Sequence, residues 1–342
     1  MDPVIQRYRK LVFFIWFLTL DLIMFGAFVR LTDSGLGCPD WPGCYGSASP
    51  LGSLSDIHAA NQAMPFGPVS LSKAWIEMIH RYAGSILGLL IIVMVYMAWR
   101  HRDRLGRSPA LATAALVVVC VQGAFGAWTV THQLMPVVVT AHLLFGMVTL
   151  AVMTWLAARE RPYRPLSAQA ARWRGWTMGG LALLTVQIAL GGWVSTNYAA
   201  LACMDFPTCH GQWLPPMDFA GGFSIIRALG ELPSGEMISQ YALTAIHWVH
   251  RNFAFVVFIY MGILAARLRS ERGLRAPANL VLGLLLAQLL TGLTTIFFEW
   301  PLLIAVLHNG GAAGLVLATV TLLVRLFTAG QPALRALAPQ PV

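Results

Sequence analysis

Charged residues are scarce in this sequence of 342 residues. Asp, Glu, Lys and Arg together make up 11% of the chain, whereas 57% of its residues are hydrophobic. Soluble domains carry roughly 25% charged residues, so the scarcity excludes an ordinary soluble fold. The chain has instead a series of apolar runs of about 20 residues, the length that crosses a bilayer as a helix. The composition therefore indicates an integral membrane protein.

Eight such runs predict an all-α protein with eight transmembrane helices. They cover about residues 11–30, 75–99, 110–131, 136–158, 172–197, 242–267, 276–298 and 302–327. The first run is too long, and too directly joined to the segment after it, for a cleaved signal peptide. We therefore expect it to remain as a span.

Acidic residues are fewer than basic ones: the chain has 14 acidic and 23 basic residues, which gives a formal net charge of +9. Such a charge can indicate nucleic-acid binding, but the basic residues gather on one side of the predicted membrane. Eighteen of the 23 lie there: Arg7, Arg9, Lys10, Arg100, Arg102, Arg104, Arg107, Arg159, Arg161, Arg164, Arg172, Arg174, Arg267, Arg269, Arg272, Arg275, Arg325 and Arg335. By the positive-inside rule this side is cytoplasmic. Both termini are therefore predicted to be cytoplasmic, and no nucleic-acid partner is expected.

Cysteine is also rare, with five residues in the chain. Cys38 and Cys44, and separately Cys203 and Cys209, have the same spacing in predicted extracytoplasmic loops. Because disulfides persist in oxidising compartments, two disulfides within loops are the favoured interpretation. A thiolate site for zinc or copper is the alternative, which the lack of paired histidines beside the cysteines makes less favoured. Cys120, inside the third span, is expected to be an inert apolar packing residue.

An internal repeat accounts for the shared spacing of the cysteines. Residues 26–44 and 191–209 agree at seven of 19 positions without a gap, where ordinary composition would give roughly one. The repeat continues into three pairs of polar residues: Gln122 with Gln288, His142 with His308, and, after a small insertion, His80 with His250. The chain thus consists of two copies of one four-helix unit.

Each unit begins on the cytoplasmic side and has an even number of spans, so the two copies have the same orientation. We predict two tandem, parallel-related four-helix bundles, residues 1–160 and 161–342. The first external loop of each unit, at 31–74 and 198–241, is long and is expected to cap the outer face. A short surface helix is expected within the second of these loops, at 219–232.

Histidine within a span is unfavourable unless it faces a cavity, a partner or a metal. His80, His142, His250 and His308 each lie five to eight residues from the outer end of their spans, about 8–12 Å deep; His247 precedes His250 by one turn. Two histidines on facing helices can take both axial positions of a haem. We therefore predict one haem between His80 and His142 and another between His250 and His308. Histidines that only hydrogen bond between helices are the alternative, and zinc would need a third close ligand.

Charged residues lie near these histidines, and some of them occur in only one half of the chain. Glu77 lies one turn before the first of them, where the second half has His247. A carboxylate there can transfer a proton or stabilise a developing positive charge, unless it is only a solvated residue at a helix start. Arg81 and Arg251 each follow a histidine, and Arg30 ends the first span, so all three can pair with haem propionates. Arginines that merely extend to the lipid headgroups are the alternative.

These motifs resemble those of the haem A synthase family. The likeness rests on Gly-x-x-Val-Arg-x-Thr-x-Ser-Gly-x-x-Cys-Pro-x-Trp-Pro-x-Cys at 26–44 and Glu-x-x-His-Arg at 77–81. It rests also on the duplicated four-helix units with His142, His250 and His308, and it spans essentially all eight helices.

The resemblance implies an enzyme that oxidises the C8 methyl group of haem O to a formyl group by successive hydroxylations, giving haem A for cytochrome oxidases. It implies that His80 and His142 hold haem O as substrate and that His250 and His308 hold haem b. Glu77 matches the functional glutamate of the family. The implied location is the inner membrane, with a haem O synthase supplying the substrate and oxidase assembly factors receiving the product.

Two other functions remain open on the residues alone. A di-haem cytochrome b that only carries electrons would use the same four histidines but would leave Glu77 without a purpose. A haem transporter or chaperone would be expected to show an inverted repeat or a discontinuous helix, and neither is seen. His247 departs from the family pattern and is a second candidate ligand beside His250.

Overall fold

Eight long helices dominate the computed structural model, which describes residues 2–161 and 165–330. Within this described part, eight helices have the length and apolar composition to span a membrane, as predicted. They are α1 (Pro3–Leu31), α3 (Leu71–Arg100), α5 (Ala110–Thr131), α6 (Pro136–Arg159), α7 (Arg174–Thr196), α9 (Gln240–Leu268), α10 (Arg275–Phe297) and α11 (Leu302–Phe327). The chain is thus a multi-pass, all-helical membrane protein.

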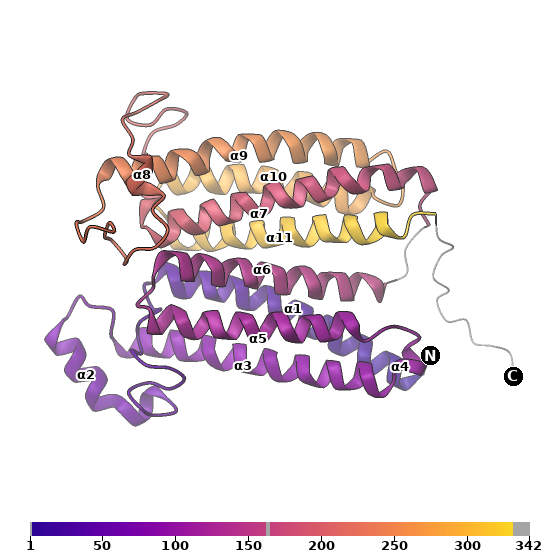
Figure 1. The fold of residues 1–342 in the computed structure, drawn as a ribbon, viewed down its shortest axis with the longest axis horizontal. Coiled ribbons are helices and arrows are strands. Elements are labelled where there is room, and N and C mark those ends of the chain that lie inside the picture. Colours follow the sequence, from indigo (N-terminus) through magenta and orange to yellow (C-terminus); the bar gives the residue numbers. More distant parts are fainter. Residues whose placement is uncertain (1, 162–164, 331–342) are drawn as a thin grey trace, which may run out of the picture.

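The long helices form two closed rings of contacts. Helix α1 packs on α3 and α6, and α5 packs on the same two helices, whereas α7 and α10 both pack on α9 and α11. Figure 1 shows the first ring below the second, and the two meet where α1, α6, α7 and α11 touch. Helices α3 and α6 therefore lie diagonally opposite in the first ring, as do α9 and α11 in the second. These are the helices that carry the four predicted ligands.

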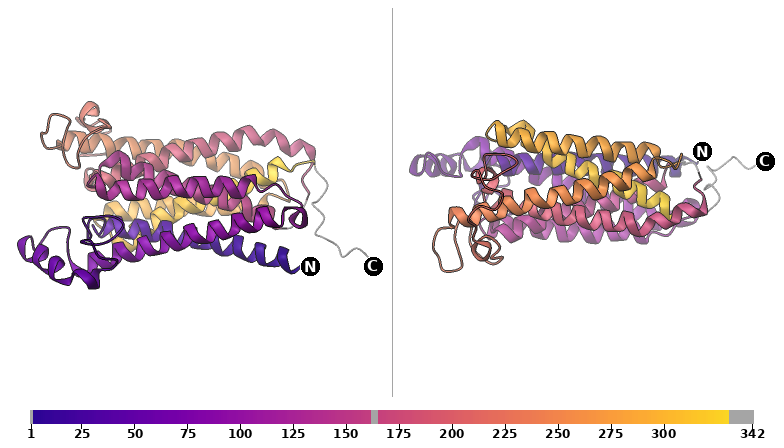
Figure 2. Two further views of the ribbon diagram at one scale, coloured as in Figure 1. Left: turned by 60° about the horizontal axis from the view of Figure 1, so that its bottom comes forward. Right: turned by 90° about the horizontal axis from the view of Figure 1, so that it is seen from above.

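The start of α1 and the end of α11 lie at the same end of the molecule, and the long loops lie at the other (Figure 2). This agrees with an even number of spans and with the sorting of the basic residues. Arg164 and Arg335, which belong to that basic set, lie outside the described residues.

Polar caps determine where three of the long helices begin. The Asp2 side chain accepts a hydrogen bond from the Val4 N–H at 2.8 Å at the start of α1. Ser70 caps α3 and Ser239 caps α9 by accepting from N–H groups three residues further on. Such caps satisfy helical N–H groups that have no partner within the helix. Ser70 and Ser239 thereby mark the points at which the two long loops return to the long helices.

The first ring is packed towards the end at which α1 begins, here called the inner end, and hollow towards the end with the long loops, here called the outer end. Buried side chains such as Ile15, Ile91, Met94, Ala115 and Met153 fill the inner half. The outer half is lined by smaller and more polar residues and holds the cavity described below. Because tightly packed interiors leave few voids, this change of side chains along the helices determines the depth of the site.

The two long loops share the conformation of their disulfide-bearing segments, and the disulfides are Cys38–Cys44 and Cys203–Cys209. Each loop also has a cis peptide bond before the proline that lies between its cysteines, Pro42 in the first loop and the corresponding proline in the second. The repeat seen in the sequence therefore extends to the backbone.

An aspartate holds the turn that follows each disulfide. Asp40 accepts from the N–H of Gly46 at 2.8 Å, and Asp205 accepts from the N–H of Gly211 at 2.9 Å. Both glycines have φ of 73°, a conformation that favours glycine. Partial burial acts to raise the pKa of Asp205, but the Thr208 hydroxyl and backbone N–H groups stabilise its carboxylate more and lower the pKa to about 2.

Shorter elements depart from the sequence-based predictions. A polar helix in the first long loop, α2 (Leu54–Ala63), was not expected, and the helix predicted over 219–232 is helical only in α8 (Phe219–Gly222). The remaining short elements are η1 (Pro50–Ser53), α4 (Arg102–Leu105), η2 (Ala168–Trp173) and η3 (Ala199–Leu201). Cys120 is exposed on the outside of α5, so its prediction as a packing residue was wrong.

Candidate functional site

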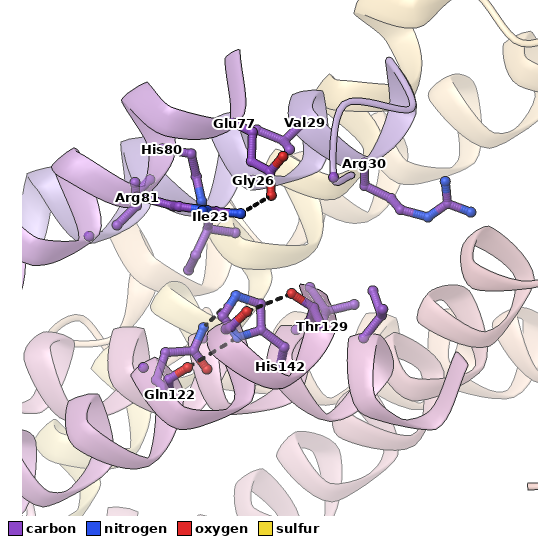
Figure 3. Close-up of a pocket in the computed structure, with 18 of the residues that line it drawn as sticks. Ile23, Gly26, Val29, Arg30, Glu77, His80, Arg81, Gln122, Thr129 and His142 are labelled. Atoms are coloured by element: carbon purple, nitrogen blue, oxygen red, sulfur yellow. Dashed lines mark hydrogen bonds and ion pairs between the residues drawn. The ribbon is translucent and has the colours of Figure 1, made fainter. Parts of the chain in front are cut away.

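A cavity of about 620 Å³ occupies the outer half of the first ring. His80 from α3 and His142 from α6 both line it, from opposite sides (Figure 3). Glu77, Arg81 and Arg30 line the same cavity. Its size lies within the range of roughly 300–1,000 Å³ usual for cofactor and small-molecule sites. The structure therefore brings together five of the residues selected from the sequence.

The imidazole of His142 is oriented by the backbone of the neighbouring helix. Its Nδ1 lies 3.1 Å from the carbonyl oxygen of Gln122. A carbonyl oxygen can only accept, so Nδ1 carries the proton and Nε2 carries a lone pair in place of a proton. Metal-bound histidines are commonly oriented in this way. The Gln122 amide lies 3.5 Å from that Nε2 (Figure 3).

Each of the four predicted ligands packs against a glycine of the helix that precedes it in its ring. The pairs are Gly26 with His80, Gly126 with His142, Gly191 with His250, and Gly292 with His308. A Cβ atom added at the glycine would lie 3.0, 3.1, 3.0 and 3.4 Å, respectively, from the nearest imidazole atom. Ordinary carbon contacts are about 3.5–4.0 Å. The glycines therefore make room for rings that point into the bundles.

Glu77 connects its helix to the first disulfide loop. Its side chain is 4% exposed. One carboxylate oxygen accepts from the backbone N–H of Cys38 at 2.8 Å, and the other accepts from Arg81 at 2.6 Å. These two interactions hold the carboxylate at the outer edge of the cavity, where a buried charge requires such partners.

His247 has the corresponding task in the second half. Its Nδ1 accepts from the backbone N–H of Cys203 at 3.2 Å, as the carboxylate of Glu77 does from Cys38. The residue is buried against the loop. One nitrogen of His247 is thus used to hold the second disulfide loop, which distinguishes it from His250 one turn further on.

The three arginines have more protein partners than the sequence suggested. Arg81 donates to the carbonyl oxygens of Asp40 and Gly43 at 2.8 and 2.5 Å. Arg30 donates to the carbonyl oxygen of Ser195 in the second ring at 2.7 Å. Its guanidinium also lies 4.3 Å from the centre of the Tyr198 ring. Arg30 thus joins the outer ends of the two rings while it lines the cavity.

Arg251 differs because, in the described part of the chain, only one of its two terminal nitrogens makes a hydrogen bond. Nη2 donates to the carbonyl oxygen of Thr208 at 3.0 Å. Nη1 is buried and has no hydrogen-bond partner within the ranges 2–161 and 165–330. Buried polar atoms are rarely left unpaired, so this nitrogen suits an anionic group that binds beside His250.

The second ring presents His250 on α9 and His308 on α11. His308 Nδ1 lies 2.9 Å from the hydroxyl of Thr291, and His250 Nδ1 lies 3.2 Å from the amide of Gln187. With their glycine neighbours and the spare nitrogen of Arg251, these residues fit a bis-histidine haem with anionic propionates. Nowhere in the described chain do three or more His, Cys, Asp or Glu side chains gather as a metal site.

Sequence reasoning missed several residues of this arrangement. Gly126 and Gly292 were not selected, although they are separated by the same 166 positions as the paired histidines and glutamines. Tyr198, whose hydroxyl donates to Asp33 at 2.7 Å across the two rings, has no repeat partner that could have indicated it. Asp21, in the middle of α1, is exposed.

Together, the fold and the site define a class: an eight-span helical membrane protein with paired inward histidines and a cavity of cofactor size. The chain belongs to the COX15-CtaA family, described as cytochrome oxidase assembly protein, whose family model matches residues 9–320.

Similar proteins from three bacteria are haem A synthases. The one from Shewanella oneidensis is 39% identical over 308 residues, which is 89% of this chain and 92% of that protein. The one from Methylobacterium radiotolerans is 30% identical and covers 89% of this chain and 86% of its own length. The one from Sphingopyxis alaskensis is 29% identical, with 95% and 94% covered. The family model itself reaches from α1 into α11.

Proposed function

We propose that this chain is a haem A synthase, a membrane oxidoreductase that converts haem O into haem A for terminal oxidases. The observation that carries this conclusion is the 39% identity over 89% of the chain to a haem A synthase. By the family resemblance, the reaction turns the C8 methyl group of haem O into a formyl group through successive hydroxylations. The cavity between His80 and His142 is the place we assign to it.

The architecture that we propose is two tandem, parallel-related four-helix units, residues 1–160 and 161–342. The two closed rings of helix contacts and the repeated loop conformations support it. We place the protein in the inner membrane, surrounded by lipid, with both termini cytoplasmic. The disulfides then lie in the oxidising compartment in which such bonds persist.

In the first unit, His80 and His142 hold the iron of haem O. The lone pair on Nε2 of His142, which the Gln122 amide nitrogen contacts at 3.5 Å, supports this role, as does the position of both rings on diagonal helices around one cavity. Side chains from all four helices of the ring line the cavity, and Ser195 and Asn309 of the second ring line it as well.

Glu77 is the catalytic residue that we assign. Each of its oxygens accepts one hydrogen bond from the protein and keeps a second lone pair. The carboxylate can therefore take a proton from the reacting substrate or stabilise positive charge that develops on it. Arg81 and the Cys38 N–H fix its position without using its full capacity to accept.

In the second unit, His250 and His308 hold haem b, which supplies electron transfer when bound. Arg251 would pair with a propionate through its spare Nη1. In the first unit, Arg81 and Arg30 would serve the propionates of haem O by exchanging some of their contacts with carbonyl groups. The contact of Arg30 with Ser195 places this residue between the two sites.

Membership of a family of cytochrome oxidase assembly proteins supports a place next to other assembly steps. We propose that a haem O synthase supplies the substrate. Assembly factors of the oxidase would then take up the product. Both reactants are hydrophobic, which favours transfer within or along the membrane over release into water.

The experiment that tests the function expresses the chain in cells that make haem O but lack haem A, and identifies the extracted haems by chromatography. Haem A should appear with the wild type and not with His142→Ala. His132→Ala, which removes an exposed histidine between α5 and α6, is the matched control and should retain the product. Haem O without any formyl product in the wild-type strain would refute the enzyme assignment.

A further inference from the structure

The hydroxyl of Thr291 fixes the ring of His308. Thr291 Oγ1 donates its proton within its own helix, to the carbonyl oxygen of Ala287 at 2.7 Å. At 2.9 Å from His308 Nδ1 the same oxygen can therefore only accept, so Nδ1 carries a proton. Nε2 is left with the lone pair that an iron ligand needs.

Gln187 provides a similar side-chain contact for His250. Its amide nitrogen lies 3.2 Å from His250 Nδ1 and 3.2 Å from the His250 carbonyl oxygen. Its Oε1 is buried and finds no hydrogen-bond partner in the described part of the chain. Because the carbonyl oxygen can only accept, the amide hydrogens face both atoms, and Gln187 orients the His250 ring from a neighbouring helix.

The first half lacks both side-chain contacts, and there the Nδ1 of His142 donates instead to the backbone carbonyl oxygen of Gln122. In the repeat, Gln187 corresponds to Leu22 and Thr291 corresponds to Phe125. Neither of these hydrocarbon side chains can hydrogen bond to an imidazole. Phe125 instead stacks on Phe145, with ring centres 5.0 Å apart, and Leu22 lines the cavity. The halves therefore share their histidines and glycines but differ in the groups that hold the imidazoles.

We infer that Gln187 and Thr291 are positioning residues that hold His250 and His308 on a permanently bound haem. In the first half Leu22 and Phe125 offer no such side chain, and a backbone carbonyl oxygen takes this part for His142. This inference rests on the proposed function. The physical reason is that a hydrogen bond to the outer nitrogen orients a metal-bound imidazole and raises its basicity.

The test measures how fast purified, haem-loaded protein loses haem b to an excess of apomyoglobin. Thr291→Val and Gln187→Leu should each speed this loss by about ten- to hundredfold, the usual effect of removing such a partner. Thr291→Ser, which restores the hydroxyl, should lose haem at close to the wild-type rate. The low-spin signal of the haem in electron paramagnetic resonance should shift in the first two variants and not in the third.

Matched controls come from the same helices. Thr294→Val and Thr185→Val remove hydroxyls that donate only to their own helix, and both should behave as the wild type. Wild-type rates of haem loss and unchanged spectra in Thr291→Val and Gln187→Leu would overturn the inference. If either variant fails to fold, Thr291→Ala and Gln187→Ala provide a second pair that removes the same hydrogen bonds, and wild-type rates of haem loss in that pair would likewise overturn the inference.

A failure of the proposed function would look different. His250→Ala and His308→Ala should lose haem b altogether if these residues are its ligands. Retention of haem b by both would refute the ligand assignment itself. Loss in these two variants, together with wild-type rates in Thr291→Val and Gln187→Leu, would refute only the positioning role.

Discussion

Substitutions at the glycines beside the histidines are predicted to affect the two haem sites separately. Gly26→Ala would place a methyl group 3.0 Å from Nε2 of His80, and Gly191→Ala would place one 3.0 Å from Cε1 of His250. Ordinary contacts are 3.5–4.0 Å, so each ring must withdraw by roughly 0.5–1 Å. A displacement of about 1 Å can lower a catalytic rate about a hundredfold.

We therefore expect opposite patterns in the two variants. Gly26→Ala should lower haem A formation by about ten- to hundredfold and leave the content of haem b unchanged. Gly191→Ala should lower the content of haem b in the purified protein. The assay is extraction and chromatography of the haems, together with the optical spectrum of the purified variants.

Two control glycines lie in the histidine-bearing helices α3 and α9, and a Cβ atom there would meet nothing within 4 Å. They are Gly88 and Gly262. Replacing either with alanine should leave both haems intact and raise stability by up to about 1 kcal/mol, because alanine is the better helix former. Wild-type haem content and activity in Gly26→Ala and Gly191→Ala would refute the argument that these close contacts position the ligands.

Three further outcomes are expected. Glu77→Gln, which keeps the shape but removes the charge, should lower haem A yield by roughly a hundredfold or more at normal content of haem b; an unchanged yield would contradict a catalytic role. Tyr198→Phe removes the hydrogen bond to Asp33 and should destabilise the protein by about 0.5–1.5 kcal/mol in thermal unfolding, whereas an unshifted midpoint would count against a link between the rings. The pKa of Asp205 is lowered to about 2 in the folded protein, so its carboxylate stabilises the fold above the unfolded pKa of about 3.9. This contribution is lost as the pH falls towards 2. The measurement is hydrogen exchange of the second disulfide loop in the wild type and in Asp205→Asn. The difference between the two proteins should shrink as the pH falls over that range. A difference that persists at pH 2 would be inconsistent with this reasoning.

Most of the helical framework could be predicted because lipid restricts what can cross it. A spanning segment needs about 20 apolar residues with all backbone groups bonded internally, so apolar runs identify helices almost directly. The predicted span over 302–327 and α11 have the same bounds, and α1 differs mainly by starting at Pro3 rather than near residue 11. Polar segments such as α2 carry no such signal, since water can satisfy an extended loop as readily as a helix.

The candidate ligands also followed from the sequence, because histidines at equal depth in a duplicated unit are rare without a cofactor. The function of their neighbours did not follow. The sequence made His247 a second candidate ligand beside His250. In the structure, its Nδ1 instead accepts a hydrogen bond from the backbone N–H of Cys203. Spacing along a helix defines a face and a depth, but it does not decide which atom on another helix a nitrogen meets.

The sequence by itself determined the membrane class, the eight spans, the duplication and the four histidines, since these depend on composition and periodicity along one chain. Only the tertiary structure decided that Gly126 and Gly292 face histidines, that Arg30 joins the two rings through Ser195, and that the imidazoles of the second half have side-chain partners. Those contacts join residues on different helices. Their geometry depends on how the helices pack, which local sequence pattern does not record.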